Sequence, residues 1–136
     1  MHVLLIDDDE QIRTLLRENL EAMGAIVTEA ESQRLALGIP REKFTFDLIV
    51  TDVDSIDLDG FAFIEHIEST IGPQRVMFVS GTDHEKRVRH RCAEHPCTVW
   101  EFARKPFSRQ TFQTKIASLM ARNPSIQNPS LILDPM

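Results

Sequence analysis

The stretch DLIVTD at residues 47–52 is a short apolar segment that ends on a carboxylate. It is partly β-branched and flanked by turn-forming residues, which is typical of a strand buried on both faces of a parallel sheet. Asp52 stands where such a strand leaves the core. In open α/β sheets, ligands bind at this carboxyl edge of the strands. The segment therefore predicts a buried strand with a polar site at its end.

Three other segments repeat this arrangement of an apolar strand followed by polar groups. Residues 3–6 (VLLI) run into the aspartates of residues 7–9, and residues 76–79 (VMFV) run into Ser80. Residues 99–102 (VWEF) are followed shortly by Lys105. If the four strands are parallel neighbours, one edge of the sheet gathers several carboxylates, a hydroxyl group and an ammonium group. This set of groups indicates a magnesium and phosphoryl site.

Helical patterns alternate with the strands, and a further strand is expected at residues 26–28. Capping residues and apolar spacing predict helices that begin near Asp9, Ser32, Gly60, Thr82 and Ser108. The first helix has an apolar stripe of Ile12, Leu15, Leu16, Leu20 and Met23. Strands that alternate with helices favour parallel pairing and right-handed crossovers. We therefore predict an α/β fold, namely a flavodoxin-like doubly wound five-stranded parallel sheet with strand order 2-1-3-4-5.

Length and composition limit the number of domains and the classes of protein to which the chain can belong. The 136 residues suit one domain, which we place at residues 1–122, with a proline-containing linker or tail at residues 123–136. The net charge of −6 disfavours nonspecific nucleic-acid binding. No apolar run approaches the length of a membrane span, and only Cys92 and Cys97 are present. These features favour a reduced, cytoplasmic protein that does not enter the membrane.

The predicted strand order makes the first and third strands neighbours, so Asp7, Asp8 and Asp52 are expected to meet across one crevice. Asp8 and Asp52 can offer carboxylate oxygens to Mg²⁺, and the backbone carbonyl of Asp54 can offer another oxygen. An aspartate can also accept a phosphoryl group as an aspartyl phosphate. The cation of Lys105 and the hydroxyl of Ser80 are then suited to stabilise the charge of the transferred group.

With these residues in place, the chain resembles the receiver domain of two-component response regulators over about residues 1–122. The matching motifs are Asp7-Asp8, Asp52, Asp59-Gly60, Ser80-Gly81 and Lys105-Pro106-Phe107. The resemblance implies that Asp52 is the phosphoacceptor and that Asp8 is a direct metal ligand supported by Asp7. It also implies that Ser80 is the switch hydroxyl, Lys105 the characteristic lysine and Phe102 the rotating aromatic residue.

Several residues depart from the family's usual pattern. Ile56 stands where a proline is usual, which affects the rigidity of the loop, and Asp54 adds a carboxylate near the acceptor. The segment at residues 84–97 is rich in His, Arg and Cys. We interpret its imidazoles and thiols as surface groups rather than as a zinc site, because their spacing matches no standard pair of zinc ligands. The role of this segment is left open.

The resemblance implies a phosphorylation-dependent switch with slow autodephosphorylation and no separate substrate. Its expected partners are a sensor histidine kinase or histidine phosphotransfer protein, together with an effector domain or target protein. We also consider a homodimer through the face of the fourth helix, fifth strand and last helix. The alternative is a haloacid-dehalogenase-type Mg²⁺-dependent phosphatase, since residues 52–55 (DVDS) resemble that family's nucleophile motif. That alternative leaves Asp7 and Asp8 without a role.

Overall fold

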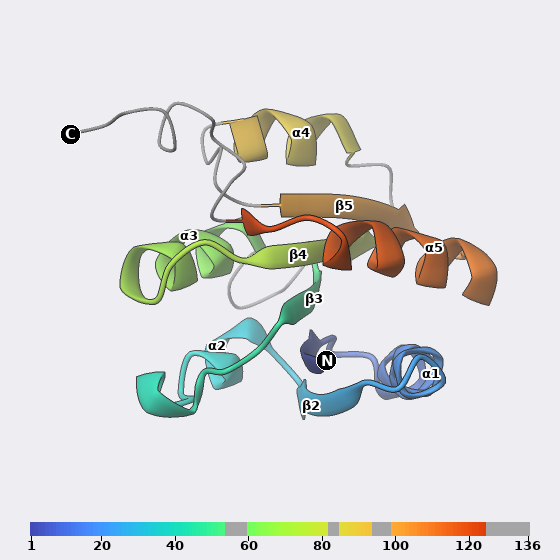
Figure 1. Cartoon of the computed structure of the whole chain (residues 1–136), viewed down its shortest axis with the longest axis horizontal. Coiled ribbons are helices and arrows are strands. Elements are labelled where there is room, and N and C mark those ends of the chain that lie inside the picture. Colours follow the sequence, from blue (N-terminus) through green and yellow to red (C-terminus); the bar gives the residue numbers. More distant parts are fainter. Residues whose placement is uncertain (54–59, 82–84, 94–98, 125–136) are drawn as a thin grey trace.

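The computed structural model describes residues 1–53, 60–81, 85–93 and 99–124. Within these residues a five-stranded parallel sheet has the order β2-β1-β3-β4-β5 (Figure 1). Its strands are β1 (His2–Ile6), β2 (Ile26–Ala30), β3 (Leu48–Asp52), β4 (Arg75–Ser80) and β5 (Val99–Arg104). The helices are α1 (Glu10–Glu21), α2 (Gln33–Ala36), the 3₁₀ turn η1 (Arg41–Lys43), α3 (Gly60–Thr70), α4 (Glu85–Ala93) and α5 (Arg109–Met120). The predicted fold class and strand order are confirmed.

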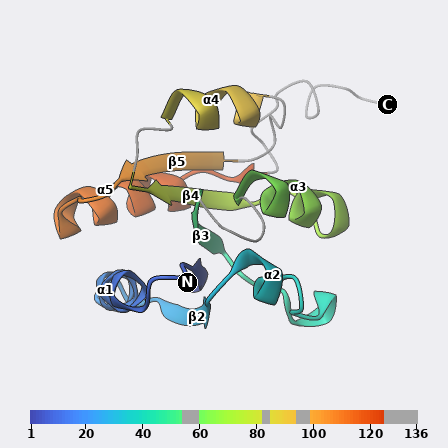
Figure 2. The same ribbon diagram turned by 180° about the vertical axis from the view of Figure 1, so that it is seen from behind.

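Helices cover both faces of the sheet, and each face has its own apolar core. Alternate residues of β1 belong to different cores. Val3 and Leu5 pack with α1 and α5, whereas Leu4 and Ile6 pack with α2, α3 and α4. Figures 1 and 2 show the resulting three layers from opposite sides. The central strands are apolar on both faces because both faces are covered. Among the described helices, none combines the length and apolarity that crossing a membrane requires.

The predicted helix starts are confirmed at three capping residues. The Asp9 carboxylate accepts hydrogen bonds from the backbone N–H groups of Gln11 (2.9 Å) and Ile12 (3.2 Å). The hydroxyls of Ser32 and Ser108 accept in the same way at the starts of α2 and α5. Such caps satisfy N–H groups that have no partner inside the helix. They also fix where each helix starts relative to the preceding strand, next to the carboxyl edge of the sheet.

One part of the predicted apolar stripe of α1 is wrong. Leu15 is 49% exposed, because it lies at the edge of the stripe rather than at its centre. The polar Asn19 is buried instead. Its side-chain oxygen accepts a hydrogen bond from Arg109 Nε at 2.8 Å, and Gln113 Nε2 donates to its backbone carbonyl at 3.1 Å. Pairing with α5 thus allows a polar side chain to occupy a core-facing position.

Strand and helix limits differ slightly from the predicted ones. β2, β4 and β5 each extend beyond the apolar residues that predicted them, and β4 includes Ser80. α4 is present, and Val88, one of its few apolar residues, is fully buried. The predicted capping residue Thr82 lies outside the described residues. Residues 125–136 also lie outside them, so the linker or tail at 123–136 stays a prediction.

Candidate functional site

Three aspartates converge at the carboxyl edge of the sheet. Asp7 and Asp8 follow β1, and Asp52 is the last residue of the neighbouring β3. One carboxylate oxygen from each of the three lies within 4.8 Å of the others. Among the described residues, these three aspartates form the one group of acidic, His or Cys side chains that lie close enough together to hold a metal ion. The predicted meeting of these residues is confirmed.

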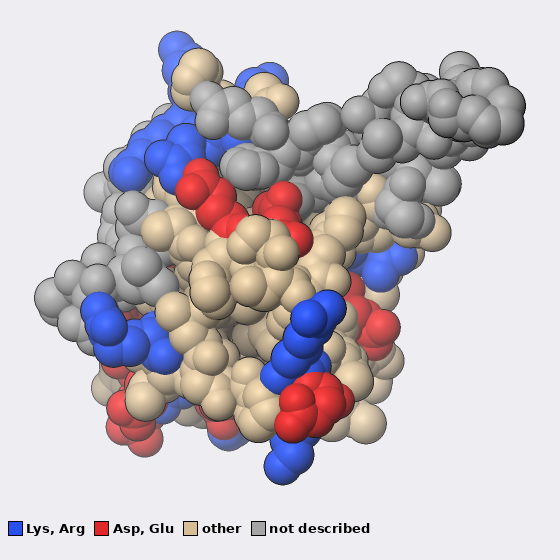
Figure 3. Space-filling view, turned by 90° about the vertical axis from the view of Figure 1, so that its left-hand side faces the viewer, with Lys and Arg blue, Asp and Glu red and all other residues tan. Residues whose placement is uncertain are grey.

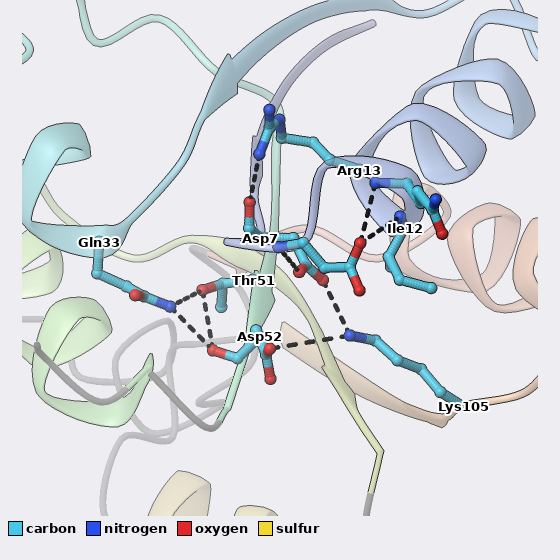
Figure 4. Close-up of polar contacts among 9 residues, drawn as sticks. Asp7, Ile12, Arg13, Gln33, Thr51, Asp52 and Lys105 are labelled. Carbon is cyan, nitrogen blue, oxygen red and sulfur yellow. Dashed lines mark hydrogen bonds and ion pairs between the residues drawn. The ribbon is translucent and has the colours of Figure 1, made fainter. Parts of the chain in front are cut away.

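Lys105 enters this cluster from the loop between β5 and α5. Its Nζ donates to Asp7 Oδ2 at 2.9 Å and lies 3.8 Å from Asp52 Oδ2 (Figure 4). Asp7 is almost fully buried, and its other oxygen accepts from the backbone N–H of Asp9 at 2.9 Å. Both oxygens of Asp7 are therefore engaged within the protein. Asp8 is exposed, so the two adjacent carboxylates have different surroundings.

Ser80 lies at the same edge, one strand away from Asp52. It is fully buried at the end of β4, one residue beyond the pairing of Val79 with Asp52. The backbone N–H of Lys105 donates to the carbonyl of Ser80 at 2.7 Å, which ties the lysine-bearing loop to β4. Asp54, the predicted source of a backbone ligand, lies outside the described residues.

Gln33 and Thr51 belong to the site, although the sequence pattern did not indicate them. Gln33 Nε2 donates to Thr51 Oγ1 and to the backbone carbonyl of Asp52, both at 3.0 Å. Gly60, at the start of α3, packs against the same carbonyl: a Cβ atom there would stand 2.6 Å from the Asp52 oxygen. A glycine is therefore required at this close approach. The only signal in the sequence was the glycine of the Asp59-Gly60 motif.

Arg13 of α1 is a second residue that the pattern did not indicate. Its Nη1 donates to the backbone carbonyl of Asp7 at 2.8 Å, and its Nε pairs with Glu29 of β2 at 3.2 Å. Glu29 also binds Arg17 at 2.8 Å, and this hydrogen bond raises the pKa of the Arg17 guanidinium above its ordinary value. These contacts fix the turn from β1 to α1, which carries the aspartate pair.

The His- and Cys-rich segment is described only in part, as α4. His84, His95 and Cys97 lie outside the described residues. His90 is exposed on α4. The surface interpretation of this segment therefore stays a prediction. The basic residues of α4 lie at the top of the face shown in Figure 3, where Lys and Arg side chains gather.

Comparison with known proteins gives consistent matches. A family model described as the response regulator receiver domain matches residues 3–117. The two-component response regulator ARR10 of Arabidopsis thaliana is 31% identical over 99 residues, which cover 70% of this chain and 18% of that protein. The uncharacterized transcriptional regulatory protein YvcP of Bacillus subtilis is 30% identical over 130 residues, covering 95% of this chain and 52% of that protein. The chain thus spans about half or less of the length of these curated relatives.

Solved structures agree with the fold. The non-phosphorylated HemR receiver domain from Leptospira biflexa has a TM-score of 0.75 at 26% identity, covering 90% of this chain and 95% of that one. A response regulator receiver domain protein from Clostridium thermocellum has a TM-score of 0.77 at 24% identity, covering 89% and 94%. The matches give no support to the phosphatase alternative. Receiver domains generally bind Mg²⁺ at an acidic pocket, and they work with histidine kinases or phosphotransfer proteins and with effector domains.

Proposed function

We propose that this chain, which belongs to the family of response regulator receiver domains, is a phosphorylation-dependent switch with Asp52 as its phosphoacceptor. The donor is a phosphohistidine on a sensor histidine kinase or histidine phosphotransfer protein. The observation that supports the proposal most directly is the convergence of Asp7, Asp8 and Asp52 within 4.8 Å, with Lys105 Nζ beside them. A carboxylate acceptor, further oxygen ligands and a cation are the groups that phosphoryl transfer requires.

The chemistry of these side chains fits Mg²⁺, which prefers oxygen ligands and is bound by one or two carboxylates. Asp8 and Asp52 would hold it, together with the backbone carbonyl of Asp54. Asp7 fits a supporting role, because both its oxygens are already engaged by Lys105 and the Asp9 N–H group. When bound, Mg²⁺ would supply the neutralising charge that lets a phosphoryl group enter a cluster of carboxylates.

In the proposed transfer, a carboxylate oxygen of Asp52 attacks the phosphorus atom. A new oxygen–phosphorus bond forms and the nitrogen–phosphorus bond of phosphohistidine breaks, with the electron pair remaining on the imidazole. Lys105 Nζ lies 3.8 Å from Asp52 Oδ2, so its positive charge would offset the negative charge of the phosphoryl oxygens. The hydroxyl of Ser80 is the proposed donor to one of these oxygens. Slow attack by water on the aspartyl phosphate would reset the switch.

The wider biological setting is part of the proposal. The output would be an effector domain or a target protein, and residues 123–136 would act as the linker or tail. The face formed by α4, β5 and α5 is the proposed signalling face and the candidate surface for a homodimer. We propose a cytoplasmic location, where a kinase can reach the acidic edge of the sheet.

A labelling experiment tests the function. Incubation with acetyl phosphate and Mg²⁺ is expected to add one phosphoryl group that hydroxylamine removes. The variant Asp52→Asn is expected to remain unlabelled, because it lacks the attacking oxygen, and intact mass measures both. Asp54→Asn is the matched control and keeps the acceptor. Label that persists in Asp52→Asn and disappears in Asp54→Asn would contradict the assignment.

A further inference from the structure

The side chain of Gln33 links the start of α2 to the end of β3, beneath the phosphoacceptor. Gln33 is only 2% exposed. Its amide nitrogen donates to the backbone carbonyl of Asp52 and to Thr51 Oγ1, each at 3.0 Å (Figure 4). A backbone carbonyl can only accept, so the amide group facing it must be the NH₂ end. Thr51 Oγ1 in turn lies 3.2 Å from the same carbonyl and can donate its hydrogen there. Both hydrogens of the Gln33 amide are thus used.

The pairing of β1 with β3 stops one residue before this carbonyl. β1 pairs with β3 only as far as Ile6 and Thr51, whereas β4 continues to pair with β3 through Asp52 and Val79. The N–H group of Val53 donates to the carbonyl of Val79 at 3.0 Å, so it points toward β4. In an extended strand, the carbonyl of the same peptide unit points the opposite way. The Asp52 carbonyl therefore points toward the side where β1 has already ended, and Gln33 takes the place of a strand partner.

The peptide unit that follows the phosphoacceptor is consequently held at both ends. Val79 binds its N–H group, Gln33 and Thr51 bind its carbonyl, and Gly60 packs against the carbonyl oxygen. The orientation of this unit sets the direction in which the Asp52 side chain leaves the backbone. Without Gln33, this carbonyl would lose one hydrogen bond and keep the one from Thr51 Oγ1, so the peptide unit would be held less firmly.

We infer that Gln33 is a positioning residue for the Asp52 carboxylate, acting through the Asp52–Val53 peptide unit. The inference rests on the proposed function, in which Asp52 is the attacking group. Gln33 does not touch the transferred group. It holds the acceptor in the geometry for in-line attack, and small errors in such geometry cost much of the rate. It also connects the start of α2 to the site, at a position where the sequence pattern indicated only a helix start.

The test compares two buried glutamines that make the same kind of bond. Gln33→Met keeps the length of the side chain and removes the donor. The matched control is Gln74→Met, because Gln74 is also buried and its Nε2 donates to the carbonyl of Gly72 at 2.9 Å, next to the opposite end of β4. We expect the initial rate of labelling by acetyl phosphate to fall about 10-fold in Gln33→Met and to change by less than about twofold in Gln74→Met.

A second readout needs neither metal nor phosphate. In the apoprotein, the carbonyl ¹³C resonance of Asp52 and the amide resonance of Val53 are expected to shift in Gln33→Met and to stay in place in Gln74→Met. Urea unfolding of both variants separates positioning from loss of stability. Gln33→Glu, which keeps the shape and replaces the donor by an acceptor, serves as a second variant if Gln33→Met does not fold, and is expected to lose rate in the same way.

The outcomes distinguish this inference from the proposed function. If the wild type and Gln74→Met are labelled and Gln33→Met is labelled at the same rate, the positioning role is overturned and the function stands. A rate loss in Gln33→Met without any shift at Asp52 or Val53 also overturns it. If the wild type is not labelled at Asp52, the proposed function falls and the positioning role falls with it.

Discussion

At the scale of single residues, Asp7 and Asp8 are adjacent in the chain and have different surroundings. Asp7 is buried and binds Lys105 through one oxygen and the Asp9 N–H group through the other. Asp8 is exposed at the same edge of the sheet. A buried carboxylate with a cationic partner is costly to disrupt, whereas an exposed one can exchange water for a ligand. The pair thus divides into a residue that holds the lysine and a residue suited to hold a cation.

This difference leads to a prediction for Asp8→Asn. The variant is expected to lose detectable Mg²⁺ binding, because one of few carboxylate ligands becomes neutral. Asp9→Asn is the matched control: it removes a neighbouring charge and keeps the cap of α1, since asparagine caps as well as aspartate. The measurement is a Mg²⁺ titration followed by backbone amide shifts. Equal affinity in Asp8→Asn and the wild type would rule out Asp8 as a ligand.

The sequence predicted residues whose chemistry depends on where a strand ends. Asp52, Ser80 and Lys105 each follow an apolar strand, and parallel strands bring their ends to one edge. Gln33 and Arg13 could not be predicted in this way. Their roles depend on how far a side chain reaches across to another element, and a buried glutamine at a helix start has no distinctive spacing. The burial of Asn19 on α1 was missed for the same reason.

At the scale of elements, α4 shows how a weakly amphipathic helix can be held. Val88 is its fully buried apolar side chain among the described residues. The guanidinium groups of Arg87 and Arg91 each lie 5.1 Å from the ring centroid of Phe61 on α3. Arg91 also pairs with Glu65 at 2.6 Å. The apolar pattern of this helix is weak, with Val88 and Cys92 as its main apolar residues. The sequence pattern therefore underestimated the helix, because basic side chains help to attach it to α3.

The same face carries a prediction about coupling. Phe102 of β5 is 6% exposed and belongs to the core cluster that includes Val88 of α4. A phosphoryl group on Asp52 would draw the hydroxyl of the buried Ser80 toward Asp52 and favour the state with Phe102 inside, a shift between two existing states. Because the ring is already buried in the structure, phosphorylation is expected to stabilise this position rather than create it.

Ser80→Ala tests that coupling. The variant is expected to accept the phosphoryl analogue beryllofluoride and to lose most of the resulting amide shifts on α4, β5 and α5, because the hydroxyl donor is gone. NMR spectra of both proteins with and without beryllofluoride provide the measurement. Asp52→Asn with beryllofluoride is the negative control. Equal displacements around Phe102 in Ser80→Ala and the wild type would show that the coupling follows another route.

At the scale of the whole molecule, the acidic site is expected to act against the stability of the fold that carries it. The chain has a net charge of −6, and three of its carboxylates lie within 4.8 Å of one another beside Lys105. Like charges at this distance repel one another, and folding brings them together. The two apolar cores on either side of the sheet must offset this repulsion. Sites kept for function commonly lower stability in this way.

Neutralising the acceptor is therefore expected to stabilise the fold. In the absence of divalent cations, Asp52→Asn should raise the free energy of unfolding by about 1 kcal/mol, which is a few degrees in Tm. Glu42→Gln is the control, because it removes one negative charge from the exposed 3₁₀ turn before β3. Thermal unfolding with and without Mg²⁺ measures the effect.

Mg²⁺ should raise the Tm of the wild type more than that of Asp52→Asn, since only a ligand bound to the native state stabilises it. An Asp52→Asn variant that is less stable than the wild type, or no more stable than Glu42→Gln, would mean that Lys105 already compensates the repulsion within the cluster.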